Sequence, residues 1–225
     1  MSGPEGSILP IYFVADESGS MASNINQLND GLNSLLDAMQ AEGMAASKVR
    51  FCVMGFDDVA RTHLELADFR NLEVMPTLGA YNSTSFAAIF RELKNRIPGD
   101  VQELKDQNYI VNRPVVFFLT DGYPNPGDGW QSAHAQLVDP EFKPHPNILA
   151  FGIGAADAAT IQAVATKPDY AFIAAAGMDT GAALKNFMIA LTASVIKSGQ
   201  VMAGGGADLQ FEKPDGFLSI ALDEV

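Results

Sequence analysis

The sequence contains only one cysteine, Cys52, in 225 residues. A single thiol cannot form an internal disulfide, and no Cys or His spacing typical of a zinc site is present. This excludes the small extracellular domains whose stability depends on disulfides. With 48% hydrophobic and 18% charged residues, the composition is instead typical of a folded domain that a large apolar core can stabilise.

Basic residues are also scarce. Lys and Arg number 14 against 27 Asp and Glu, which gives a formal net charge of −13. Such a chain repels phosphate backbones and anionic lipids, so we expect no nucleic-acid partner and no membrane partner. The excess of carboxylates leaves room for a bound cation or a basic partner.

Long apolar runs are absent as well. No stretch reaches the roughly 18 residues of a membrane span. The first residues, MSGPEG, lack the basic and apolar segments of a signal peptide. The expected location is therefore cytoplasmic.

The chain alternates short apolar runs with amphipathic segments. We predict strands at residues 8–15, 48–56, 59–66, 114–120, 147–153 and 170–174, and helices at 26–40, 85–97, 101–110, 130–138, 157–166 and 180–197. This alternation predicts an α/β fold with a doubly wound, mostly parallel six-stranded sheet and helices on both faces. Residues 59–66 are expected as one antiparallel edge strand. Pro98-Gly99 is expected to interrupt the helical pattern.

The composition changes after Ser198, so residues 1–198 are predicted to form the domain and 199–225 an appendage. Glycines 204–206 are expected to form a flexible tether. Two apolar segments, 209–212 and 217–222, flank a turn signature at 213–216, which predicts a C-terminal β-hairpin. The hairpin could pair with the sheet edge, dock elsewhere on its own domain or join another chain, and a disordered tail is the alternative.

Oxygen-bearing side chains follow three of the predicted strands. Asp16, Ser18 and Ser20 come after the first strand, Thr84 precedes a helix, and Asp121 follows the strand at 114–120. Carboxyl ends of parallel strands meet at one sheet edge, where α/β folds bind ligands. Carboxylate and hydroxyl oxygens suit hard cations such as Mg²⁺, Mn²⁺ or Ca²⁺. Taken singly, each fragment could instead be a helix cap or a turn.

This combination of D-x-S-x-S, a distal threonine and a distal aspartate resembles the von Willebrand factor type A domain over roughly residues 8–198. That family carries a metal-ion-dependent adhesion site (MIDAS). The segment RPVVFFLTDGYP, with AFGIG downstream, is most similar to the bacterial, tellurium-resistance-associated TerY-like branch. Asn82-Ser83 replace the glycines that often precede the threonine, so Ser83 and Ser85 compete with Thr84 as the ligand.

The resemblance implies a role for each of the five residues. Ser18 and Ser20 would ligate the metal through their hydroxyls, Thr84 directly or through water, and Asp16 and Asp121 would supply negative charge. A protein partner presenting an acidic residue would complete the coordination. The implied function is a non-enzymatic, metal-dependent protein-binding module in a bacterial stress-response or tellurium-resistance pathway, with Mg²⁺ as the first choice of metal.

The alternative is an enzyme that uses Asp16 as the nucleophile of a Mg²⁺-dependent phosphoryl transfer. Phosphatases of the haloacid dehalogenase type usually need a second aspartate two residues later and a lysine near the late acidic motif. Here residue 18 is serine, and no lysine lies between residues 106 and 142. The sequence therefore favours the binding module.

Several neighbours of these motifs admit two interpretations. We expect Glu17 to point into solvent, and Asp57-Asp58 to form either a turn or an acidic rim. Tyr123 and Trp130 could each recognise a partner or pack into the core. Cys52, in the middle of a strand, is expected to be an inert core thiol.

Overall fold

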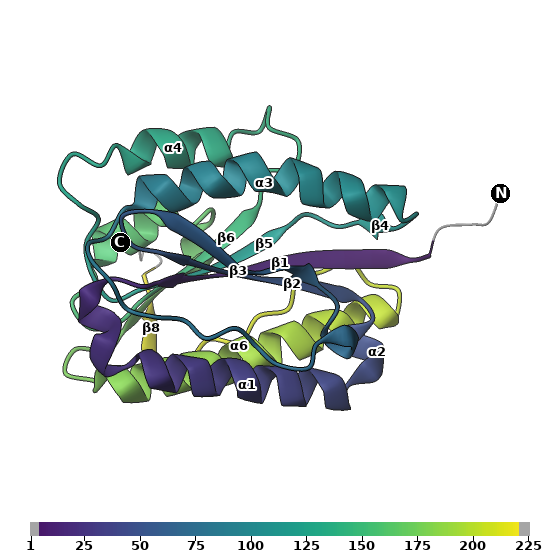
Figure 1. The fold of residues 1–225 in the computed structure, drawn as a ribbon, viewed down its shortest axis with the longest axis horizontal. Helices are drawn as coiled ribbons and strands as arrows, with labels where there is room; N and C mark the ends of the chain where they lie inside the picture. Colours follow the sequence, from purple (N-terminus) through teal and green to yellow (C-terminus); the bar gives the residue numbers. More distant parts are fainter. Residues whose placement is uncertain (1–4, 221–225) are drawn as a thin grey trace, which may run out of the picture.

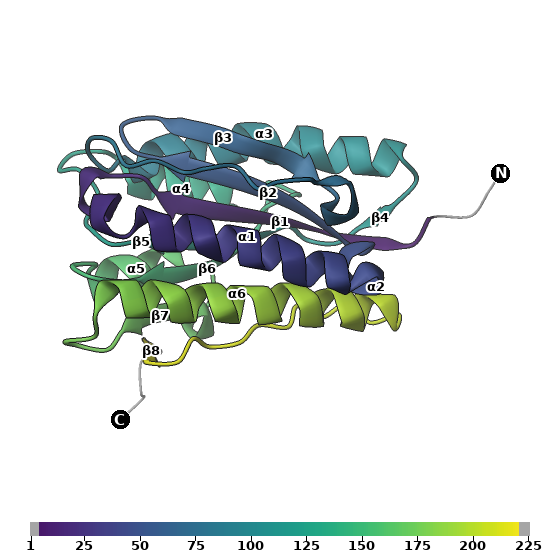
Figure 2. The ribbon, with the colours of Figure 1, turned by 60° about the horizontal axis from the view of Figure 1, so that its bottom comes forward.

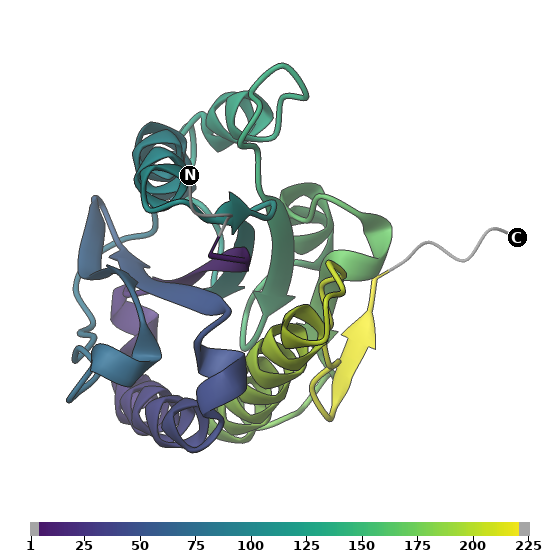
Figure 3. The same cartoon turned by 90° about the vertical axis from the view of Figure 1, so that its right-hand side faces the viewer.

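The computed structural model describes residues 5–220, which form a mixed sheet between two layers of helices (Figure 1). The strands are β1 (Ser7–Asp16), β2 (Val49–Phe56), β3 (Ala60–Ala67), β4 (Ile110–Val111), β5 (Val115–Thr120), β6 (Asn147–Gly152), β7 (Ala171–Ala174) and β8 (Phe217–Ser219). Their order is β3-β2-β1-β5-β6-β7-β8, and β4 pairs with the start of β1. All neighbours are parallel except β3 and β8, which run antiparallel at the two edges (Figure 3). The predicted α/β class, parallel sheet and antiparallel β3 are confirmed.

The helices cover both faces of the sheet. They are α1 (Ile25–Ala41), α2 (Gly43–Ala46), α3 (Phe86–Asp106), α4 (Trp130–Leu137), α5 (Ala158–Val164) and α6 (Thr180–Ala203), with 3₁₀ turns at Gly19–Ser23, Phe69–Asn71 and Pro168–Tyr170. Helices α1 and α6 lie side by side on one face (Figure 2), and α3, α4 and α5 pack on the other. Within residues 5–220, no helix combines the length and apolarity that crossing a bilayer requires.

Strand β1 contributes side chains to both apolar cores of the domain. Its side chains alternate between two cores: Phe13 packs with α1 and α6, while Tyr12 and Val14 pack with α3 and α4. All three are fully buried. Burying one large apolar side chain contributes about 1.5–3 kcal/mol. Both faces of β1 therefore anchor the strand that ends in Asp16.

Helix α3 differs from the prediction. It runs without interruption through Pro98 and ends at Asp106, whereas we expected a break at Pro98-Gly99 and a second helix to residue 110. Leu93, Ile97, Val101 and Leu104 form one buried stripe on both sides of the proline. Packing of this stripe outweighs the loss of one helical hydrogen bond, a case in which tertiary contacts override local propensity.

The C-terminal segment also differs. Helix α6 continues past the boundary predicted at residue 198, as far as Ala203. Residues 209–212 are extended but form no strand: the Ser198 hydroxyl bonds to both the main-chain N–H and the carbonyl of Gln210, and Ser194 accepts from the N–H of Glu212. The predicted hairpin is therefore wrong, because its first arm lies against α6.

The second arm of the expected hairpin forms β8, which pairs with β7. Of the alternatives left open for the tail, the structure shows pairing with the sheet edge. Together with β4, this strand brings the sheet of the described residues to eight strands instead of the predicted six. Residues 221–222 of the predicted arm lie outside the described residues.

Candidate metal centre

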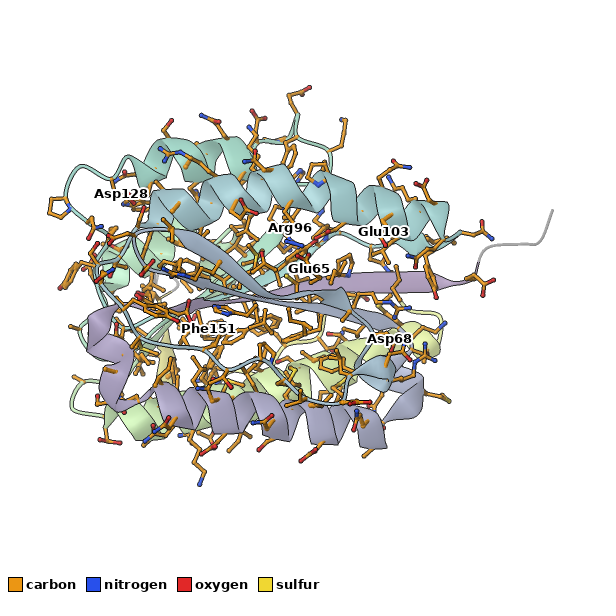
Figure 4. All side chains as sticks on the ribbon, viewed as in Figure 1. Glu65, Asp68, Arg96, Glu103, Asp128 and Phe151 are labelled. Atoms are coloured by element: carbon orange, nitrogen blue, oxygen red, sulfur yellow. The ribbon has the colours of Figure 1, made fainter. Side chains whose placement is uncertain are left out.

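The candidate metal ligands meet at the carboxyl ends of β1 and β5, two neighbouring parallel strands in the middle of the sheet. Asp16 is the last residue of β1, and Asp121 directly follows β5. From β1 the chain first builds β2 and β3 on one side of β1 and later builds β5 on the other side. Open α/β sheets bind their ligands at the point where the strand order reverses in this way. In Figure 4 the labelled Asp128 lies at this end of the molecule and Asp68 at the opposite end.

Hydrogen bonds join four of the five predicted ligands. Asp16 Oδ1 accepts from the main-chain N–H of Ser18 at 2.8 Å. The hydroxyls of Ser18 and Ser20 share a hydrogen bond of 3.0 Å, and Ser20 Oγ donates to Asp121 Oδ1 at 2.7 Å. Thr120 Oγ1 donates to the other oxygen of Asp16 at 2.6 Å. These bonds join Asp16, Ser18, Ser20, Thr120 and Asp121 into one continuous polar cluster.

The fifth predicted ligand, Thr84, is 7% exposed. Its main-chain N–H donates to Asn125 Oδ1 and its carbonyl accepts from the Asn125 N–H. Within residues 5–220, no group hydrogen-bonds to the Thr84 hydroxyl. The Gly19 N–H donates to the Asn82 carbonyl at 3.0 Å, so the loop that carries Thr84 lies against the Ser18–Ser20 segment. A hydroxyl that has no partner within the protein is free to bind an external ligand.

The competing hydroxyls beside Thr84 are already engaged. Ser83 Oγ donates to Asp58 and accepts from Asn125. Ser85 Oγ donates to Asp128 and caps α3 by accepting from the Ala88 N–H. Thr84 is therefore not the helix cap, and of the three hydroxyls it alone is available.

Burial sets the electrostatics of the two carboxylates. Desolvation raises the pKa of Asp16 to about 6, although hydrogen bonds from Thr120 and Ser18 offset part of the shift. Burial likewise raises the pKa of Asp121. Removing two carboxylates from water is unfavourable, and a divalent cation between them would offset this cost. A cation bound beside Asp16 and Asp121 would therefore be favoured electrostatically.

The donor set fits a hard metal ion. Two carboxylates and three hydroxyls supply only oxygen, the ligand type that Mg²⁺, Mn²⁺ and Ca²⁺ prefer. Among the described residues, no group of three or more His, Cys, Asp or Glu side chains could hold a metal. A site of this kind depends on neutral hydroxyls in addition to its two carboxylates.

Glu17 does not point into solvent as we expected. Its side chain is fully buried, where Oε1 accepts from the Gly79 N–H at 2.9 Å and Oε2 contacts His63 Nε2 at 3.0 Å. Two further polar residues of the site were not predicted from the sequence: Asn125, which binds the main chain of Thr84, and Thr120, which binds Asp16. The position of Thr120 directly before Asp121 was the available signal for that residue.

The structure also distinguishes between the two interpretations given for Asp57, Trp130 and Tyr123. Asp57 is buried and forms a turn by accepting from the Val59 N–H. Burial would raise its pKa, but two hydrogen bonds from Arg61 hold this pKa below its ordinary value. Trp130 packs against Phe86 and Phe90 in the core, whereas Tyr123 is 60% exposed. Tyr123 is therefore the aromatic side chain of this pair that a partner could contact.

Solved structures share the fold at low sequence identity. The pilus adhesin SpaC from Lactobacillus rhamnosus GG matches with a TM-score of 0.66 and 15% identity over 87% of this chain and 31% of its own. Proximal thread matrix protein 1 from the mussel byssus, described with a zinc-occupied MIDAS motif, matches with a TM-score of 0.55 and 18% identity over 86% of this chain and 46% of its own. A von Willebrand factor type A protein from Catenulispora acidiphila matches with a TM-score of 0.52 and 17% identity over 85% and 43%.

The chain thus spans less than half the length of each of these structures. No curated protein sequence matches it. The family model of the von Willebrand factor type A domain matches residues 11–187, a range that includes all five candidate ligands. The chain therefore belongs to the von Willebrand factor type A domain family.

Proposed function

We propose that this domain is a non-enzymatic, metal-dependent protein-binding module. Asp16, Ser18, Ser20, Thr84 and Asp121 would hold a divalent cation, with Mg²⁺ as the first choice and Mn²⁺ or Ca²⁺ as alternatives. The observation that carries the proposal is the hydrogen-bonded cluster of Asp16, Ser18, Ser20 and Asp121 beside the unpartnered Thr84 hydroxyl.

Each residue has a distinct role in this proposal. Ser18 and Ser20 would bind the cation through neutral hydroxyls, Thr84 would contribute its free hydroxyl, and Asp16 and Asp121 would balance the charge. When bound, a cation with few carboxylate ligands supplies an electrophilic position for an acidic side chain of a partner protein. Tyr123, which is exposed two residues after Asp121, would contact the partner's residues around its acidic side chain.

The alternative of phosphoryl transfer has less support. The sequence offers neither the second aspartate nor the nearby lysine that haloacid dehalogenase-type phosphatases usually need. Asp16 is also fully buried. We therefore propose that the domain does not hydrolyse phosphate esters. A bacterial cytoplasmic pathway, such as one for stress or tellurium resistance, is the setting that the sequence resemblance favours.

Calorimetric titration with Mn²⁺ and with Mg²⁺ tests the metal site. We expect one site in the parent domain and no binding in Asp121→Ala. Asp208→Ala removes an exposed carboxylate near the opposite end of the sheet and should bind like the parent. Equal binding by Asp121→Ala and the parent would refute the assignment.

Partner binding is tested separately. Proteins retained by the immobilised parent domain in Mg²⁺ should be released by chelator, and Asp16→Ala should not retain them in either condition. If the proteins stay bound in chelator and also bind Asp16→Ala, their binding does not depend on the metal. Metal-dependent phosphatase turnover that Asp16→Asn abolishes would instead establish the enzyme.

A further inference from the structure

Glu17 lies between Asp16 and Ser18, yet its side chain turns away from the candidate metal centre into the protein. The carboxylate is fully buried beside β2 and β3. It accepts a hydrogen bond from the Gly79 N–H, contacts His63 Nε2 at 3.0 Å and lies 3.8 Å from the Arg61 guanidinium. A buried carboxylate is costly unless such partners surround it.

The space for this side chain depends on Gly55. A Cβ atom at position 55 would lie 2.0 Å from Glu17 Oε2 and 2.3 Å from Cδ, which is far inside van der Waals contact. Gly55 is paired with Ala15 in the β1–β2 ladder, directly beside the turn into the metal loop. The missing side chain at position 55 thus leaves the volume that Glu17 fills.

Glu17 connects the two loops that carry hydroxyl ligands. Its carboxylate holds the Gly79 N–H, and its own carbonyl accepts from the Tyr81 N–H at 2.7 Å. Further along the two loops, the Gly19 N–H donates to the Asn82 carbonyl. These three bonds fix residues 79–82, which end two residues before Thr84, against residues 17–19, which contain Ser18.

The guanidinium of Arg61, which lies beside Glu17, restrains the chain on the other side of Thr84. Arg61 donates two hydrogen bonds to Asp57, at 2.8 and 3.1 Å, and the Asp57 carbonyl accepts from the Ser85 N–H at 2.7 Å. The Arg61 guanidinium also lies 4.5 Å from the centre of the Tyr81 ring. Glu17 therefore belongs to a partly buried network that restrains the chain before and after Thr84.

From these contacts we infer that Glu17 is a positioning residue for the metal centre. It binds no metal itself, but it sets the place of the Thr84 hydroxyl relative to Ser18 and Ser20. This inference deepens the proposed function and rests on it, because it assumes a cation at the five candidate ligands.

A double-mutant cycle with Mn²⁺ as the probe tests the inference. Calorimetry would give the Mn²⁺ affinity of the parent, Glu17→Ala, Thr84→Ala and the double variant, and denaturation in chelator would give their stabilities. We expect Glu17→Ala to weaken Mn²⁺ binding by about 10- to 100-fold, the range for residues that support metal ligands. We also expect Thr84→Ala to weaken binding in the parent but to change it by less than about twofold in the Glu17→Ala background.

Asp68→Ala is the matched control. Asp68 is also a nearly buried carboxylate paired with arginines, Arg50 and Arg70, but it lies at the opposite end of the molecule (Figure 4). Its loss should lower stability without changing Mn²⁺ affinity. If Glu17→Ala behaves in the same way, or if the Glu17 and Thr84 effects multiply independently, the inference is overturned. Failure of the parent to bind Mn²⁺ would instead refute the proposed function itself.

Two further variants keep the test informative if Glu17→Ala does not fold. Glu17→Gln retains an oxygen for the Gly79 N–H, so it should lose less affinity than Gly55→Ala, whose methyl group displaces the carboxylate. Parent-like Mn²⁺ affinity in folded Gly55→Ala would overturn the inference as well.

Discussion

Replacing Asp16 with asparagine should stabilise the metal-free domain while removing its affinity for metal. Asp16 is fully buried, and its pKa is raised from an ordinary value of 3.8 to about 6. One pKa unit corresponds to about 1.4 kcal/mol, so ionised Asp16 destabilises the fold by about 3 kcal/mol at neutral pH. Asparagine keeps an oxygen for the Ser18 N–H and adds an N–H that Thr120 Oγ1 can accept. It therefore removes the charge with little change in the hydrogen bonds.

The sign of the pH dependence follows from the raised pKa. Between pH 3.8 and about 6 the folded state holds the Asp16 proton more tightly than the unfolded state, so this group lowers stability as the pH rises. Its cost is complete above pH 6 and absent below pH 3.8. The parent and Asp16→Asn should thus converge in acid and differ by about 3 kcal/mol at pH 7, or roughly 6–12 °C in Tm for a domain of this size.

Metal should reverse the order of the two proteins. At a free Mn²⁺ concentration of about 1,000 times Kd, the parent gains about 4.1 kcal/mol, which exceeds its deficit of about 3 kcal/mol, whereas Asp16→Asn should gain almost nothing. Urea denaturation at pH 4, 5, 6 and 7, in chelator and in Mn²⁺, measures all of these differences. An Asp16→Asn variant that is less stable than the parent at pH 7 in chelator would refute the reasoning.

Three other predictions concern the fold. Truncation after Gly206 removes Phe211 and Phe217 and uncovers the edge of β7, so stability should fall by about 3 kcal/mol or more and gel filtration should show self-association. An unchanged urea midpoint and a monomer would contradict this. Pro98→Ala restores an N–H inside continuous helix α3 and should stabilise the domain by about 1–3 kcal/mol, and a lower urea midpoint than that of the parent would contradict this. Burial raises the pKa of the Cys52 thiol to about 12, so alkylation at pH 8 should occur only in denaturant, and fast labelling of the native domain would show that β2 opens.

The sequence predicted the sheet because its central strands are continuous apolar runs. In β1, β2 and β5 almost every side chain is buried, so the apolar pattern alone located them to within a residue or two. The five candidate ligands were predictable for a related reason: each lies at a strand end or in a loop at the carboxyl end of the sheet's parallel strands, and strand order brings these segments together.

Other features depend on contacts that no local pattern encodes. Helix α3 continues through Pro98 because the sheet binds its apolar stripe, and residues 209–212 follow α6 because Ser194 and Ser198 supply the hydrogen bonds. Glu17 was misplaced for the same reason. A lone glutamate in a polar loop is normally solvated, and its partners Gly79 and His63 are distant in sequence.

The fit between Glu17 and Gly55 has a consequence for the evolution of related chains. No side chain can be added at position 55 while a glutamate fills the adjacent volume, because the new Cβ would overlap the carboxylate. A relative that carries alanine or a larger residue at this point of the second strand must therefore either have a shorter residue in the first variable position of its D-x-S-x-S motif or turn its glutamate away from this volume. The two positions are separated by 38 residues in sequence, and we expect them to change together across lineages.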